Sequence, residues 1–238
     1  MSVTIYYYED IVTNAIVELL KKQGFKHFQP LTDNDIILTH EKKYGFPIED
    51  ESAVLLWGDG YYHQVSFHFS PNKRYSKVLY DAHDDFAIYV DNSEFSLANH
   101  NTFLIEKDPL VDTIDVLGSN MKTSFEYVDE SQQFTRTFNS TPSLVIPFEN
   151  RHTHCSVDLD VIRGYPCNPR FKSCAQRSST EENVTQSLDQ LFDNNDVSRL
   201  DIGGLGFTHV YKGKKRKIRK GTEVIAHIVH QYINNRTQ

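Results

Sequence analysis

Short apolar runs recur along the chain, and segments with helical periodicity separate several of them. Val3–Tyr8 (VTIYYY) is rich in residues that favour strands, and the segment after it places an apolar stripe on one face of a helix that closes at Lys21, Lys22 and Gly24. Continuous apolarity is typical of strands covered on both faces. The other runs that predict strands are Asp35–Thr39, Ala53–Trp57, Lys77–Tyr80, Leu144–Phe148, His154–Leu159 and Leu200–Leu205.

Two further helices are predicted in the second half of the chain. Ser179 and Glu182 form a capping box, in which each side chain satisfies a backbone N–H at the helix start, and apolar residues at helical spacing follow as far as Phe192. A last helix is predicted from Thr222 to about Asn234 because its apolar residues again recur every three or four positions.

The middle of the chain, residues 86–141, follows no single period. Val111–Leu117 and Thr123–Val128 are candidates for peripheral strands within it. Strands that alternate with helices predict an α/β fold with a mostly parallel sheet wrapped by helices. No repeat or linker interrupts this pattern, so a single domain is expected over residues 1–238.

Composition narrows the class of protein. A chain of 238 residues, 39% of them hydrophobic, is long enough to bury one substantial core. A net charge of −7 does not favour nucleic acid or an anionic membrane as a partner. The sequence has neither a secretory signal nor a run long enough for a membrane helix, and its three cysteines suit thiols in a reducing compartment. A cytoplasmic protein is therefore expected.

Acidic residues and a histidine follow two of the predicted strands. Asp81, His83 and Asp85 come at the end of one apolar run, and Asp158 and Asp160 come at the end of another. A single D-x-D is most often a solvated loop or a helix cap. Two such groups at the carboxyl ends of neighbouring strands would converge on one crevice, where four carboxylates need cations to coexist. Carboxylate oxygens mixed with imidazole suit Mn²⁺ or a similar divalent ion.

The two segments, DAHDD (Asp81–Asp85) and SVDLD (Ser156–Asp160), resemble the paired metal motifs of the arginase and agmatinase family, the ureohydrolases. The resemblance covers roughly residues 53–104 and 152–205. It implies an arginase-like three-layer α/β/α fold with a mostly parallel sheet and two Mn²⁺ ions per chain. By the same resemblance, Asp81 and Asp158 bridge the two ions, Asp85 completes the shell of the first, and His83 and Asp160 complete the shell of the second.

At some other positions the sequence differs from the family pattern, and a nearby residue is the candidate for the same role. Gly60 stands where a ligand histidine is expected, and His63 is the candidate to replace it. His100 resembles the loop histidine that passes a proton to the leaving amine. Gly203 and Gly204 stand where the family has the glutamate that holds the guanidinium, and Asp201 is the nearest carboxylate.

The polar residue that grips the α-carboxylate of free arginine is also missing, because the stretch after the first motif, DDFAIYV, is apolar. The resemblance therefore points to a peptide arginase, which converts arginine within a peptide to ornithine and releases urea. Two alternatives stay open: a ureohydrolase of free arginine, agmatine or formiminoglutamate, and a non-catalytic binding protein of the same fold. The basic run Lys212–Lys220 is interpreted as a solvated loop before the last helix, with a patch that recruits an acidic leader peptide or nucleic acid as the alternative, and oligomerisation is left open.

Overall fold

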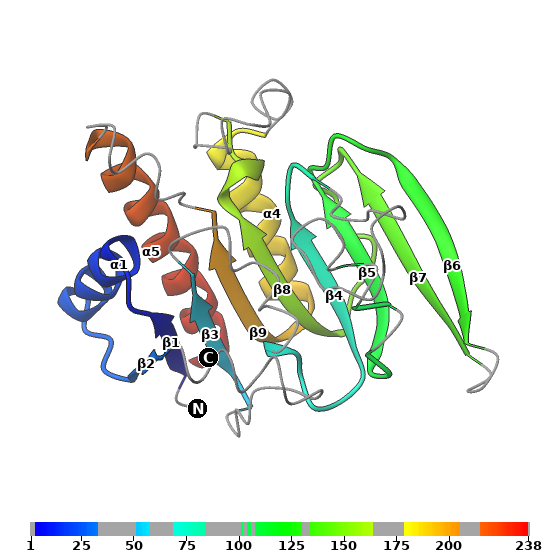
Figure 1. Ribbon diagram of the computed structural model, residues 1–238, viewed down its shortest axis with the longest axis horizontal. Helices are drawn as coiled ribbons and strands as arrows, with labels where there is room; N and C mark the ends of the chain where they lie inside the picture. Colours follow the sequence, from blue (N-terminus) through cyan, green and yellow to red (C-terminus); the bar gives the residue numbers. More distant parts are fainter. Residues whose placement is uncertain are drawn as a thin grey trace.

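A single mixed sheet dominates the computed structural model, which describes residues 3–32, 51–57, 69–83, 101, 104–105, 108–129, 134–163, 179–204 and 215–237 (Figure 1). Nine strands in these residues follow the order β2-β1-β3-β9-β8-β4-β5-β7-β6. Every neighbouring pair is parallel except β6 and β7, so the mostly parallel sheet predicted from sequence is confirmed. The strands are β1 (Thr4–Tyr8), β2 (Phe28–Leu31), β3 (Ala53–Leu56), β4 (Tyr75–Tyr80), β5 (Val111–Leu117), β6 (Thr123–Asp129), β7 (Phe134–Thr141), β8 (His152–Asp158) and β9 (Asp196–Gly203).

Three α-helices in the described residues pack on one face of this sheet: α1 (Ile11–Lys22), α4 (Glu181–Asn194) and α5 (Lys215–Thr237). Asp10 begins α1 by accepting hydrogen bonds of 2.7 Å from the backbone N–H groups of Val12 and Thr13. Apolar side chains from the three helices join those of β1, β3, β4, β8 and β9 in one large core cluster. None of the described helices has the length and apolarity needed to cross a membrane.

The opposite face of the sheet carries separate apolar clusters, one around Trp57 and Phe69 and another around Tyr75 and Phe138. Side chains alternate between the two faces along each strand. In the centre of the sheet, this second face therefore receives Lys77 of β4 and His154 of β8, which are paired neighbours and fully buried.

The apolar run Leu144–Phe148 was predicted as a strand, and that prediction is wrong. Residues 143–148 form no regular element, and Leu144, Ile146 and Phe148 turn inward at alternate positions to pack against the helix-side core. The strand in this region is β7, whose sequence FTRTFNST is mostly polar. The edge strand β2 was not predicted either, because its sequence FQPL contains a proline, which is tolerated at the edge of a sheet.

Two predicted helix starts also need correction. Thr180, not Ser179, caps α4 and accepts the N–H of Asn183 at 3.2 Å, because the backbone of Ser179 is bridged to Ile162. Helix α5 begins at Lys215 rather than Thr222, so residues 215–220 of the basic run are helical and not a loop. Lysine and arginine have high helix propensity, which extends the helix beyond its apolar stripe. The predicted strand Asp35–Thr39 lies outside the described residues.

Candidate metal centre

The two acidic motifs follow neighbouring parallel strands. Tyr80, the last residue of β4, pairs with Val157 of β8, so both strands end at the same edge of the sheet, here called the carboxyl edge. Asp81 comes directly after β4, and Asp158 is the last residue of β8. Asp160 lies in a single 3₁₀ turn (Leu159–Val161), which begins when the Asp158 side chain accepts the N–H of Asp160 at 3.0 Å.

These elements bring three potential ligands together. The Nδ1 atom of His83 lies 3.0 Å from Oδ2 of Asp160 and 3.3 Å from Oδ1 of Asp81. One ligand atom from each of the three side chains lies within 4.8 Å of the other two. Two backbone hydrogen bonds fix the carboxylates, from Ala82 N to Asp160 at 3.1 Å and from His83 N to Asp81 at 2.7 Å. The predicted meeting of the two motifs is confirmed as a matter of geometry.

Burial makes negative charge on the carboxylates of this cluster unfavourable unless a positive charge compensates it. Asp81 is 1% exposed and Asp160 is 8% exposed. Burial, and then the nearby carboxylate of Asp160, raise the pKa of Asp81 well above its usual value. Burial alone would lower the pKa of His83, but its bonds to Asp160 and Asp81 outweigh that effect and raise it. Two buried carboxylates thus need a positive charge between them, and two carboxylates with an imidazole are a donor set that fits a divalent ion such as Mn²⁺.

Comparison with solved structures identifies the fold of this chain. No family model matches the sequence, and no curated protein matches it either. Among solved structures, proclavaminate amidinohydrolase from Streptomyces clavuligerus superposes with a TM-score of 0.63 at 14% identity, covering 97% of this chain and 91% of the other. Arginase from Bacillus subtilis gives 0.60 at 13% identity, covering 98% of each chain. Agmatine ureohydrolase of Thermoplasma volcanium gives 0.60 at 11%, covering 99% and 90%.

This chain has the arginase fold. The predicted class, an arginase-like α/β/α arrangement with a mostly parallel sheet, is therefore confirmed, and the resemblance drawn from DAHDD and SVDLD holds at the level of the fold. Identities of 10–14% leave the reaction and the substrate to be argued from this chain's own residues.

Within the arginase fold of this chain, Gly204 stands beside Asp158 in a way that excludes a side chain. Gly204 has a φ of +93°, and a Cβ built on it would lie 2.0 Å from Oδ1 of Asp158 and 2.7 Å from the backbone nitrogen of Leu159. The preceding residue, Gly203, pairs directly with Asp158 across β8 and β9. A glutamate at position 204 is therefore sterically excluded, because Asp158 occupies the volume that a side chain there would need.

Asp201 lies two residues deeper in β9, at the register of Ser156. Its carboxylate is fully buried and contacts His154 Nε2 at 2.7 Å through one oxygen and Ser156 Oγ at 2.7 Å through the other. Burial lowers the pKa of His154 to about 4, although the contact with Asp201 opposes that effect. A substrate-binding role for Asp201 stays a prediction, and its observed contacts fix the middle of β8 against β9.

Sequence reasoning assigned no role to Gly118 and did not foresee the constraint at Gly204. Gly118 follows β5 with a φ of +83°, and a Cβ there would lie 2.5 Å from Cγ2 of Val161, in the turn that carries Asp160. A lone glycine after an apolar run is the only trace of this packing in the sequence. His63, Asp85 and His100 lie outside the described residues, so their assignments stay predictions.

Proposed function

We propose that this chain is a metal-dependent hydrolase of the arginase type that acts on an arginine held within a peptide, giving peptidyl ornithine and urea. The observation that carries the proposal is the buried cluster of Asp81, His83 and Asp160 at the carboxyl edge of the sheet. Ligands in open α/β sheets bind at that edge. A buried set of two carboxylates and an imidazole has no need to exist for stability alone, since apolar residues would cost less.

The metal ligands in this proposal are Asp81, His83, Asp158 and Asp160, with Asp85 and His63 completing the set for two Mn²⁺ ions. Bound at this place, such ions lower the pKa of a water molecule and thereby provide a hydroxide at neutral pH. The chain's own contribution is to hold the carboxylates in place through the backbone N–H groups of Ala82 and His83. His100 is proposed to donate a proton to the departing amine nitrogen of the ornithine side chain.

The peptide context is supported by what the site lacks. The residues directly after Asp85, Phe86–Ile88, are apolar and offer no polar groups to a free α-carboxylate. A site without these groups gains little by selecting a free amino acid, because specificity comes from contacts with the non-reacting parts of a substrate. An arginine whose amino and carboxyl groups are already in amide bonds needs no such contacts.

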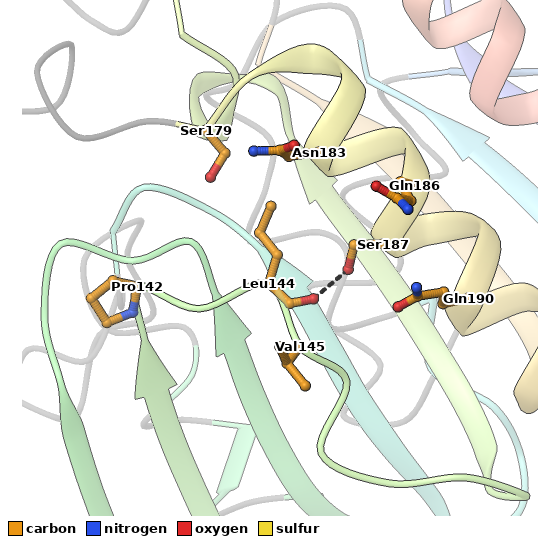
Figure 2. Close-up of a pocket in the computed structure, with 8 residues that line it drawn as sticks. All are labelled: Pro142, Leu144, Val145, Ser179, Asn183, Gln186, Ser187 and Gln190. Atoms are coloured by element: carbon orange, nitrogen blue, oxygen red, sulfur yellow. Dashed lines mark hydrogen bonds between the residues drawn. The ribbon is translucent and has the colours of Figure 1, made fainter.

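A neutral groove beside the site suits a peptide chain. Asn183, Gln186 and Gln190 of α4 line a cavity of about 360 Å³. Pro142, Leu144 and Val145 lie on its other side (Figure 2). Ser187 in the same wall donates a hydrogen bond to the carbonyl oxygen of Leu144. The groove continues to Ser179, which is bridged to Ile162, two residues beyond Asp160. Side-chain amides both donate and accept hydrogen bonds, as the backbone of an extended peptide requires.

The test compares substrates on the Mn²⁺-loaded protein by measuring urea and product mass. We expect urea from an arginine-containing peptide and much less from free arginine or agmatine. Gln186→Ala and Gln190→Ala should raise KM for the peptide and leave the metal content unchanged, with Glu182→Gln, on the same helix but outside the groove, as the matched control. Urea from free arginine alone would refute the peptide context. Absence of urea from every guanidino compound, with two metals bound per chain, would refute the hydrolase itself.

A further inference from the structure

A second cavity opens at the opposite edge of the sheet, where the parallel strands begin. It has a volume of about 510 Å³, a size suited to a small molecule. Lys77–Tyr80 of β4 separate it from Asp81, a distance of about 16 Å along the strand, so it is not part of the metal centre. Its lining residues are Arg74, Tyr75, Ser76, Asp112, Thr113, Thr135, Thr137, Arg151 and His152. We propose that this cavity binds a small oxyanion, a carboxylate or a phosphate, with Arg151 as the principal ligand.

Arg151 is held in position before any ligand arrives. Its guanidinium lies 4.7 Å above the ring of Phe148, and its Nη1 donates to Ser76 Oγ at 3.3 Å. Its backbone N–H donates to Asn195 Oδ1 at 3.1 Å, and its carbonyl oxygen accepts the N–H of Asp196 at 2.9 Å. When a guanidinium stacks on an aromatic ring, the N–H donors along its edges stay available to bind a ligand. Such preorganisation reduces the entropy lost when a ligand is bound.

The charges around Arg151 leave its guanidinium without an acidic partner among the described residues. Arg74 is ion-paired with Asp112 at the rim of the same cavity. Asp196 is engaged by His152, at 2.7 Å, by Arg236 and by Lys73. A further carboxylate, Asp115, accepts a hydrogen bond from Asn139 at 2.9 Å; burial raises its pKa and the positive charge of Arg151 opposes that rise, but no ion pair joins the two side chains. An oxyanion would supply the missing negative charge.

The floor of the cavity supplies hydroxyl groups. Thr113 of β5 pairs with Ser76 of β4 on one side and with Thr137 of β7 on the other, and the three side chains lie on the helix side of the sheet. Hydroxyl donors beside a guanidinium suit the oxygens of a carboxylate or phosphate, since arginine forms two parallel bonds with either group. An uncharged ligand would use the hydroxyls but would leave the guanidinium uncompensated, which is why we infer an anion.

The test uses the metal-free protein in EDTA, so that its result does not depend on the proposed hydrolase activity. Thermal unfolding and calorimetric titration are measured with sodium phosphate and with sodium succinate, against sodium chloride at matched ionic strength. We expect saturable binding of at least one of the two oxyanions, and the one that binds identifies the ligand chemistry. Arg151→Gln should weaken this binding at least about tenfold. Arg151→Lys keeps the charge but loses the two parallel donors of the guanidinium, so its affinity should lie between those of the wild type and Arg151→Gln.

Lys73→Gln is the matched control, because Lys73 pairs with Asp196 next to the cavity but does not line it. Binding should survive that change. If Arg151→Gln does not fold, Thr137→Val, which removes a floor hydroxyl and leaves Arg151 in place, decides the same question through a several-fold loss of affinity. No saturable effect beyond that of chloride, or an equal loss in Lys73→Gln and Arg151→Gln, would overturn the proposal.

Discussion

Replacing Gly204 by alanine should separate the cost of an unfavourable backbone from the cost of displacing a metal ligand. The residue has a φ of +93°, a conformation that costs a residue with a side chain about 1–2 kcal/mol. In addition, the new Cβ would lie 2.0 Å from Oδ1 of Asp158 and 2.7 Å from the backbone nitrogen of Leu159. Neither contact is tolerable, so Asp158 must move away from its present position.

Gly24 provides a control with almost the same backbone. Its φ is +98°, and a Cβ there would meet no atom within 4 Å. Gly24→Ala should therefore lose only the backbone term of about 1–2 kcal/mol, which is about 2–8 °C in melting temperature for a chain of this size. Gly204→Ala should lose more than this, and it should also lose Mn²⁺ affinity by more than the roughly 10–100-fold typical of outer-shell changes.

The assay measures thermal unfolding in EDTA and Mn²⁺ binding by calorimetry for the wild type and both variants. Gly24→Ala is expected to bind Mn²⁺ like the wild type. If Gly204→Ala also binds Mn²⁺ with unchanged affinity, then either Asp158 is not a ligand or its position does not matter, and the role given to Gly204 is wrong. Equal losses of stability in the two variants would show that the contact with Asp158 relaxes without cost.

Three further predictions test other parts of the structure. Because burial lowers the pKa of His154 to about 4 from about 6.5 in an unfolded chain, only the unfolded state binds this proton between those values, and stability should fall by on the order of 3 kcal/mol as pH drops through that window. Denaturant titrations at several pH values should show that the free energy of unfolding depends less steeply on pH in His154→Gln than in the wild type. An identical dependence on pH would contradict this. Asp160→Asn should lose metal binding by calorimetry but keep its melting temperature in EDTA, since the amide oxygen still accepts the N–H of Ala82; retained metal affinity would remove Asp160 from the ligand set. Thr180→Ala should cost about 1 kcal/mol by loss of the α4 cap, whereas Ser179→Ala should cost less than about 0.5 kcal/mol, and the reverse order in thermal unfolding would restore the capping box predicted from sequence.

The helix-side core was readable from the sequence, because its strands are covered on both faces. Ala53–Leu56 is buried and apolar at every position, and Tyr75–Tyr80 is buried throughout and ends in the apolar run Val78–Tyr80, so both strands are easily recognised. Strand β7 is different, since its face on the helix side of the sheet carries the polar residues Thr135, Thr137 and Asn139. Its polar positions gave no continuous run, and only pairing with β5 and β6 makes it a strand.

Leu144–Phe148 shows the converse error. The run is as apolar as a buried strand, but it covers the core from outside the sheet, with Leu144, Ile146 and Phe148 inward and Val145 72% exposed. The apolar residues of this run correctly predict burial. They do not indicate whether the segment is a strand of the sheet or packs over the core from outside the sheet.

For the candidate metal centre, the order of the residues shows which ligands are available and at what spacing: Asp81 and His83 after one buried run, and Asp158 and Asp160 after another. Their spacing along each strand end is local, so it can be read along the chain. The folded chain was needed to show that β4 and β8 are neighbours, that His83 lies between Asp81 and Asp160, and that position 204 must be glycine. The same is true of Arg151, whose neighbours Ser76 and Asn195 are distant in sequence. Those facts depend on which strands pair and how closely their ends approach, and such long-range packing leaves no periodic signal in the order of the residues.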